Sequence, residues 1–286
     1  MRVLLLVLAV VAPQLTDELQ RIPDSGTHSS QPGYLGFDRN EYPGDANLKP
    51  LSKTFSYAGY WLNNPPGANA NSWTGTRRTI QDAGFGFLVI FNGRTYAEIK
   101  AHGDAIKLGS SDAATAALSA RAEGFPPNTI IFLDQEQGGR LLPPQRSYLH
   151  AWIDGVNSAN FVAGVYCSGI AAKEGAGTSV ITANDIHENA VGRLIKYWVV
   201  NDSCPPSPGC SVSRRDLSPD SSGISFADVW QFSQSPQRSD VAGACPANYN
   251  KDRNCYPPPT QGLTQYLRLD LDVATSSDPS HGRQHD

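Results

Sequence analysis

The chain has 286 residues and a formal net charge of −4, and only 17% of its residues are charged. A chain of this length can bury one large core, and the sparse charge excludes the strongly basic surface of a nucleic-acid-binding protein. The 26 glycines and 21 prolines indicate many turns, and no repeat of solenoid or propeller period is present, so we expect a single domain.

The N-terminus, MRVLLLVLAVVA, has one arginine followed by ten apolar residues. This run is too short to span a bilayer but is typical of the core of a signal peptide. We expect a signal peptide at residues 1–17, a linker at 18–32, a barrel domain at 33–274 and a disordered tail at 275–286. The mature protein would then be secreted or extracytoplasmic, without a transmembrane segment. The alternatives are a misassigned start codon or an apolar tail that packs on the domain.

Four cysteines lie in two proline-rich loops, Cys204 with Cys210 and Cys245 with Cys255. In an exported chain they most simply form two disulfides, and pairing within each loop is the shortest of three connectivities. A zinc site is the rival interpretation, but the loops contain no CxxC motif and no nearby histidine. Cys167 lies in the apolar run VAGVYCSG, which indicates a buried thiol in a strand. We expect no metal and no cofactor.

Hydrophobic patterning predicts eight strands, at residues 34–38, 54–62, 86–91, 128–136, 162–168, 194–200, 227–232 and 267–273. Helices are predicted between several of them, at residues 76–83, 112–123, 145–160 and 183–191. Repeated βα units with eight strands favour a (β/α)₈ barrel, here irregular in its second half because helix signals are weak there. A doubly wound open sheet is the alternative, but it needs a glycine-rich turn after the first strand, where Arg39–Asn40–Glu41 stand.

The strand at 128–136, NTIIFLDQE, carries the most informative pattern. Its four consecutive apolar residues predict a strand buried on both faces, and Asp134 and Glu136 follow with both carboxyl groups on one side. Buried charge at the end of a barrel strand is costly and is typical of a catalytic site. The other strand ends are expected to bring further residues to this mouth: Asp38, Tyr60, Asn92, Tyr166, Asn201 or Asp202, Trp230, Gln231, and Asp270 with Asp272.

Acids with aromatic and amide neighbours match the needs of glycoside hydrolysis, in which one carboxylic acid protonates the leaving oxygen and a second carboxylate attacks or stabilises the oxocarbenium-like centre. Aromatic rings stack on the apolar faces of sugars, and Tyr60, Trp61 and Trp230 are the rings expected to do so. No GxSxG motif indicates a serine nucleophile. Of the two acids on the last strand, Asp270 and Asp272, we favour Asp270 for the site.

Four motifs in order, YLGFD, FLDQE, VWQFS and LDLDVA, together with the helix DAATAALSARAEGFP, resemble the glycoside-hydrolase-like domain family DUF1906, which is typified by an exported mycobacterial protein. That family is similar to the family 25 muramidases, barrel enzymes that act on peptidoglycan. The resemblance covers residues 33–274. It implies Glu136 as general acid, Asp134 as second carboxylate, and Asp38 and Asp270 as further acids. The cysteine loops depart from the muramidase pattern.

The resemblance also implies that Trp230–Gln231 lines a sugar cleft, with peptidoglycan or a related aminosugar polymer as the partner. The competing hypothesis is a carbohydrate-binding protein that kept the barrel and lost turnover, and a weaker third is a metal-dependent hydrolase. If Glu136 has only a structural role, it forms an ion pair with Arg140 or Arg94. Similarly, the rings of Tyr60, Tyr166 and Trp230 can belong to the core.

Overall fold

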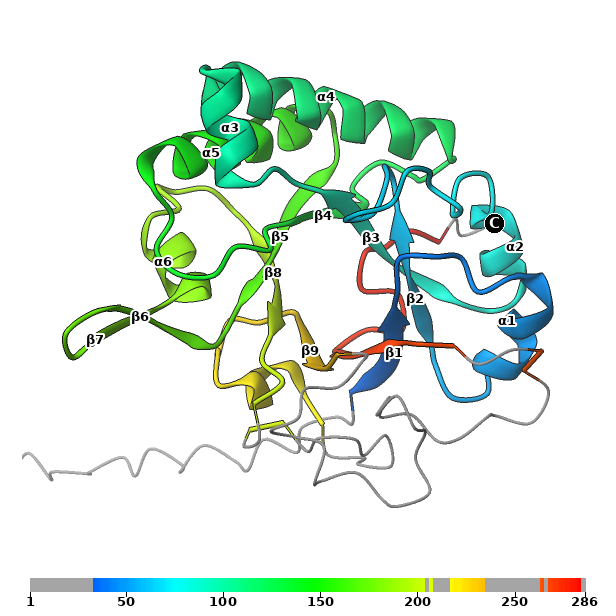
Figure 1. The fold of residues 1–286 in the computed structure, drawn as a ribbon. Helices are drawn as coiled ribbons and strands as arrows, with labels where there is room; N and C mark the ends of the chain where they lie inside the picture. Colours follow the sequence, from blue (N-terminus) through cyan, green and yellow to red (C-terminus); the bar gives the residue numbers. More distant parts are fainter. Residues whose placement is uncertain (1–32, 204–205, 208–216, 235–262, 265–266, 284–286) are drawn as a thin grey trace, which may run out of the picture.

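The computed structural model describes residues 33–203, 206–207, 217–234, 263–264 and 267–283. Eight strands close into a barrel in the order β1-β10-β9-β8-β5-β4-β3-β2 (Figure 1). They are β1 (Tyr34–Asp38), β2 (Tyr57–Trp61), β3 (Gly86–Asn92), β4 (Ile130–Asp134), β5 (Val162–Ser168), β8 (Lys196–Val200), β9 (Val229–Ser233) and β10 (Asp270–Ala274). Each predicted strand is present, which confirms the barrel.

The irregularity predicted for the second half of the barrel is found at its last strand, β10. Seven strands are parallel to one another, but β10 runs antiparallel to both of its neighbours, β1 and β9. The expectation that Asp270 stands at the C-terminal end of a parallel strand is therefore wrong. It is the first residue of β10 and pairs with Asp38, the last residue of β1. The reversed direction thus brings Asp270 to the same mouth.

Helices cover the outside of the barrel: α1 (Asp45–Leu51), α2 (Arg77–Asp82), α3 (Tyr96–His102), α4 (Ala105–Ala122), α5 (Pro143–Ser158) and α6 (Thr182–Glu188). A hairpin of β6 (Ala171–Gly175) and β7 (Thr178–Ile181) projects beside α6, and a short 3₁₀ helix spans Pro219–Ser222 (Figure 1). None of the helices in the described ranges is long and apolar enough to cross a membrane.

Four of these helices match the predicted ones, whereas α1, α3 and the hairpin were not predicted. The helix expected from Asp112 begins earlier, because the Asp104 side chain accepts a hydrogen bond from the backbone N–H of Lys107 and caps α4. Helices α4 and α5 lie against each other, and Trp152 of α5 packs its ring against Phe91 of β3. These contacts, together with those of α5 to β5, hold the outer layer against the barrel.

The segment after β10 is packed and not disordered, so the expected tail at 275–286 is wrong for residues 275–283. Ser280 accepts a hydrogen bond from the N–H of Ile130 at 2.8 Å and donates its own to Phe87 O at 2.9 Å. Its hydroxyl accepts from the N–H of Val89 at 2.8 Å. Small polar residues here satisfy backbone groups at the N-terminal ends of β3 and β4, a role that composition does not reveal.

Asp278 offers a test of this packing, because its two oxygens accept hydrogen bonds from the N–H groups of Phe87 and Arg283, at 2.8 and 2.9 Å. We expect Asp278→Ala to lower the free energy of unfolding by about 1–3 kcal/mol, since it leaves backbone donors unpaired. Urea unfolding measures the change. Asp82→Ala, which breaks only an exposed pair with Arg78, is the control and should cost less than about 0.5 kcal/mol. Equal stability of both variants would contradict the packed tail.

Candidate active site

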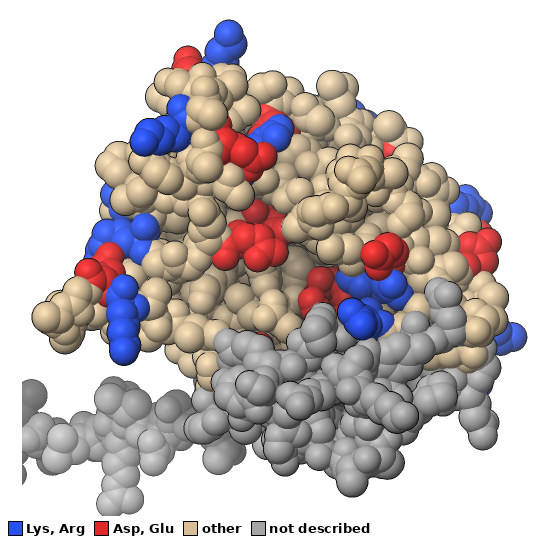
Figure 2. Space-filling view, viewed as in Figure 1, with Lys and Arg blue, Asp and Glu red and all other residues tan. Residues whose placement is uncertain are grey.

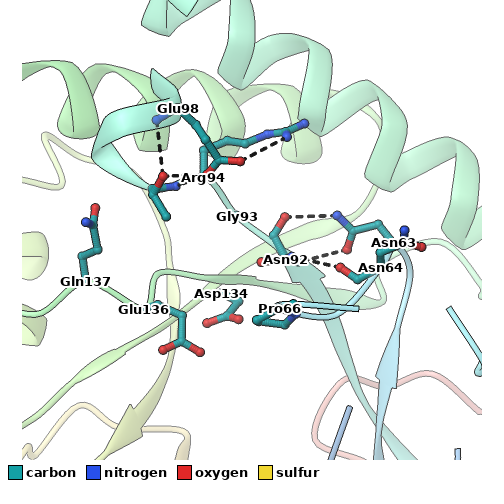
Figure 3. Close-up of a pocket in the computed structure, with 12 residues that line it drawn as sticks. Asn63, Asn64, Pro66, Asn92, Gly93, Arg94, Glu98, Asp134, Glu136 and Gln137 are labelled. Carbon is teal, nitrogen blue, oxygen red and sulfur yellow. Dashed lines mark hydrogen bonds and ion pairs between the residues drawn. The ribbon is translucent and has the colours of Figure 1, made fainter. Parts of the chain in front are cut away.

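Two adjoining cavities occupy the mouth of the barrel. The smaller, of about 170 Å³, is lined at the strand ends by Asp38, Asn40, Trp61, Pro66, Asp134, Glu136, Tyr166, Trp198, Gln231, Gln234 and Asp270. The larger, of about 630 Å³, shares Pro66, Asp134 and Glu136 with it and extends towards α3 (Figure 3). Acidic side chains gather in the hollow at the centre of this face (Figure 2). The two carboxyl groups that follow β4 therefore lie where the cavities join.

Strand β4 places these two acids. Its residues Ile130–Leu133 are buried, and Asp134 at its end is only 5% exposed. The backbone N–H of Gln135 donates to Tyr166 O of β5 and holds the chain extended beyond the strand, so that Glu136 points to the same side as Asp134. Glu136 is exposed at the cleft. Figure 3 shows both carboxyl groups directed into the same space, with Pro66 beyond Asp134.

Both members of this pair hold protons more tightly than ordinary carboxyl groups. Burial raises the pKa of Asp134 well above its usual value, and the charges of Glu136 and Asp38 raise it further. Its Oδ1 has no hydrogen-bond partner in the described part of the chain. The cleft walls remove hydration from Glu136, which raises its pKa as well. The pair can therefore keep a proton at a pH where an ordinary carboxyl group is ionised.

Asp38 faces this pair from the end of β1. Its Oδ2 accepts a hydrogen bond of 2.8 Å from the amide of Gln231, and the amide oxygen accepts another of 2.8 Å from the hydroxyl of Tyr166. Burial raises the pKa of Asp38 to about 6, against the lowering effect of hydrogen bonds from Gln231 and Asp272. Tyr166, Gln231 and Asp38 thus form one polar chain across the barrel, from β5 through β9 to β1.

Asp270 lines the smaller cavity, as expected. Asp272 was passed over, yet it lies deeper in the barrel, fully buried, with Oδ1 accepting a 2.9 Å hydrogen bond from the indole N–H of Trp198. Burial raises its pKa well above the usual value. The sequence signal was present in the spacing Asp-Leu-Asp, because alternate residues of a strand face the same side.

Two expected cleft residues face outward. Tyr60 is fully buried between the barrel and the helices, where its hydroxyl donates to Glu123 and its ring packs against Phe125. Trp230 is also fully buried, and its indole N–H donates to Asn201 O at 2.9 Å. Neither lines either of the two cavities described above. Strand alternation explains both errors, because the neighbours of these residues on β2 and β9 are the ones that face inward.

Those neighbours are Trp61 and Gln231, and both line the smaller cavity. The indole N–H of Trp61 donates to Arg39 O at 3.0 Å, which fixes the ring. Trp198 is a cavity residue that sequence reasoning missed. Its ring centroid lies 4.4 Å from that of Tyr166, so the two form one aromatic wall. The inward side of β8 was again readable from alternation.

The larger cavity is walled by polar groups. Asn92 lies there as expected, and its amide donates to Asn64 O at 2.9 Å, while the Asn63 side chain exchanges hydrogen bonds with the Asn92 backbone. The side chain of Arg94 forms a two-point ion pair with Asp112, at 2.8 and 2.9 Å. This wall therefore presents fixed amides beside the acid pair.

Neither expected arginine partner holds Glu136. Arg94 is committed to Asp112, and Arg140 pairs with Glu174 at 2.8 Å and Asp185 at 3.1 Å. The interpretation of Glu136 as one half of a structural ion pair with either arginine is wrong. Its carboxyl group faces the cleft.

The predicted disulfide cysteines, Cys204, Cys210, Cys245 and Cys255, lie outside the described residues, as do the expected signal peptide and linker. Cys167 is a fully buried free thiol in β5, as predicted, and burial raises its pKa. Within the described ranges, no group of three or more His, Cys, Asp or Glu residues is arranged to hold a metal ion.

Comparison with known families gives a match to the Rv2525c-like glycoside hydrolase-like domain over residues 53–209, more than half of the chain. The chain belongs to this family. The matched span includes Asp134 and Glu136, whereas Asp38 and Asp270 come from strands outside it. A search of curated proteins found no match.

Solved structures share the fold of this glycoside hydrolase-like domain. An uncharacterized B. stearothermophilus protein is 17% identical, with a TM-score of 0.52 over 85% of this chain and 96% of that one. The Mycobacterium tuberculosis Tat-secreted protein Rv2525c, in complex with L-tartrate, is 12% identical, with a TM-score of 0.50 over 88% and 100%. GHIP, a glycosyl hydrolase 25 of Streptococcus pneumoniae, is 11% identical, with a TM-score of 0.50 over 87% and 89%.

The raised pKa of Asp38 predicts a dependence of stability on pH. Between the unfolded value near 4 and the folded value of about 6, the folded protein binds the extra proton, so its stability falls as the pH rises. Asp38→Asn removes this loss. We expect the variant to gain about 2 kcal/mol over the wild type between pH 4 and pH 7, measured by urea unfolding at both values. Asp82→Asn, an exposed acid, should show no such gain; a gain independent of pH in Asp38→Asn would contradict the assignment.

Proposed function

We propose that this protein hydrolyses β-1,4 glycosidic bonds in peptidoglycan or a related aminosugar polymer, with Glu136 as general acid and Asp134 as second carboxylate. The observation that carries the proposal is the placement of these two acids. They stand side by side where two cavities meet, both with raised pKa, and neither expected arginine neutralises Glu136. Such a pair can supply a proton and a negative charge to one bond.

Glu136 suits the role of acid because its carboxyl group is exposed to the cleft and its pKa is raised. Protonation of the glycosidic oxygen by Glu136 lets the leaving sugar depart with its electron pair on that oxygen. Asp134 is nearly buried beside it and, in its ionised form, stabilises the positive charge that develops at the sugar carbon. Water then bonds to that carbon and gives up a proton to Glu136, which returns to its acid form. Asp38 and Asp270 contribute negative charge from the opposite wall of the smaller cavity.

The walls fit a glycan. Trp61, Tyr166 and Trp198 give the smaller cavity aromatic surface for the apolar faces of a sugar ring. The larger cavity supplies amides of asparagine and glutamine, which can hydrogen-bond hydroxyl and acetamido groups. With the acid pair at the junction, a polymer bound through both cavities has one of its linkages beside Glu136.

Similarity to characterised proteins supports the same assignment. The family is named for a glycoside hydrolase-like domain, and the pneumococcal protein GHIP of similar fold is a glycosyl hydrolase 25. The mycobacterial protein Rv2525c is Tat-secreted. Together with the apolar N-terminal run, these support an extracytoplasmic site of action for this protein, where a cell-wall polymer is accessible.

We expect Glu136→Gln to lower the rate of hydrolysis by about 10²–10⁴-fold, because the amide cannot donate the proton. Turbidity of purified cell walls and release of reducing ends measure the rate. Glu41→Gln, which alters only an exposed acid paired with Arg39, is the control and should keep full activity. Unchanged activity of Glu136→Gln would overturn the general-acid assignment, and binding of cell walls without release by the wild type would favour the non-catalytic carbohydrate-binding protein.

Two adjacent residues of β2 allow a test that distinguishes a cleft residue from a core residue. Trp61 lines the smaller cavity and Tyr60 faces the helices. We expect Trp61→Leu to weaken binding of soluble cell-wall fragments by about tenfold, through loss of aromatic contact with sugar. Tyr60→Phe should leave this binding unchanged and lower the free energy of unfolding by about 1–3 kcal/mol, since the carboxylate of Glu123 loses the tyrosine hydroxyl as a donor and keeps the backbone N–H of Gly75. Calorimetric titration and urea unfolding measure the two effects, and weakened binding in Tyr60→Phe would contradict the outward orientation.

A further inference from the structure

Asp272 lies inside the barrel below the cleft and lines neither cavity. It is fully buried on β10, opposite Gly36 of β1 and Gln231 of β9 in the strand register. The Tyr57 ring lies over Gly36, where a side chain would collide with it. Asp272 therefore occupies a closed interior position without direct access to a substrate, and any effect on chemistry passes through a neighbouring group.

That neighbour is Asp38. The register of β1 with β10 makes Asp38 and Asp272 diagonal neighbours on the inner face of the barrel, since Asp38 pairs with Asp270 and Gly36 with Asp272. A side-chain hydrogen bond between the two carboxyl groups contributes to the pKa of each. Ionised carboxylates only accept hydrogen bonds, so this contact requires one of the two to carry a proton. Oδ1 of Asp272 already accepts from the Trp198 indole, and its Oδ2 finds no N–H or O–H donor in the described part of the chain. An unpartnered, fully buried carboxylate oxygen beside an acceptor is the position for an acid proton.

We propose that Asp272 is a positioning residue that remains a neutral carboxylic acid and donates a hydrogen bond to Asp38, keeping Asp38 ionised and fixed at the cleft. Asp38 then receives two donors, Gln231 at Oδ2 and the acid group of Asp272. Two further hydrogen bonds hold these groups in place. The Trp198 indole N–H donates to Asp272, and the Tyr166 hydroxyl donates to Gln231. The consequence for catalysis rests on the proposed function, whereas the protonation of Asp272 does not.

The surroundings decide which carboxyl group holds the proton. Asp272 is fully buried, and its pKa is raised well above normal, whereas Asp38 is 6% exposed and has a pKa of about 6. Arg39, the cation next in sequence, pairs with Glu41 instead. The titratable groups near Asp38 are Tyr57 of β2, Asp134 and Glu136 at the end of β4, Tyr166 of β5, and Asp270 and Asp272 of β10. All of them are neutral or acidic, so only hydrogen bonds oppose protonation of Asp38.

Infrared spectroscopy tests the protonation directly and without a substrate. Wild type and Asp272→Asn are compared at pH 7, where the C=O stretch of a protonated carboxylic acid distinguishes it from an ionised one. Bands from any other acid that has the same protonation state in both proteins cancel in the difference. We expect the difference spectrum to show the loss of one protonated carboxylic acid. Loss of an ionised carboxylate band instead would overturn the proposal, whether or not the protein is an enzyme.

Activity on cell walls tests the positioning role. The Asn side chain can donate to Asp38 and accept from Trp198, so Asp272→Asn should keep kcat within about twofold. Asp272→Leu removes both interactions, and kcat should fall by about tenfold, with the acidic limb of the pH profile moving to higher pH. Equal loss in both variants with unshifted profiles would overturn the role. If Asp272→Leu does not fold, full activity of Asp272→Asn together with its infrared difference supports the proposal, and an inactive Asp272→Asn that folds contradicts it.

Discussion

Strand β10 runs antiparallel between β1 and β9, and its register sets Asp38 directly opposite Asp270 and places Asp272 opposite Gln231. The composition of the site depends on this pairing. Because side chains alternate along a strand, a shift of one residue would turn both acids of β10 out of the barrel. The same register allows Gln231 to reach Asp38 and Trp198 to reach Asp272. Thus the pairing of β10 with its two neighbours places Asp38, Asp270 and Asp272 together on the inner face of the barrel.

Concentrating carboxyl groups inside a barrel costs stability. Asp38, Asp134 and Asp272 are all buried, and each has a raised pKa because its ionised form loses hydration. The apolar residues of β3 and β4 and the packing of α4 against α5 offset this cost. The donors differ among the acids, since Asp38 and Asp272 receive side-chain hydrogen bonds and Asp134 Oδ1 does not. Unequal environments of this kind separate carboxyl groups that hold protons from those that carry charge.

The sequence predicted the barrel and the acid pair because both depend on local patterns. Apolar runs identify buried strands, and the spacing of Asp134 and Glu136 puts both on one side of an extended chain. It failed where orientation depends on the partner strand. Tyr60 and Trp230 looked equivalent to Trp61 and Gln231, and only the register of the closed barrel distinguishes inward from outward. The reversed direction of β10 carries no local signal either.

Because the chain is synthesised from its N-terminus, the pairing of β10 with β1 and β9 has a further consequence. Strands β1 and β9 stay unpaired along one edge until β10, the last strand of the barrel, is available to close them. Asp270 and Asp272 arrive in that same step, and the segment around Ser280 then crosses beneath β3 and β4. A chain interrupted before β10 therefore has two strands with unpaired backbone groups, which can pair with another chain, and it lacks Asp270 and Asp272. Closure of the barrel and completion of the site are one event.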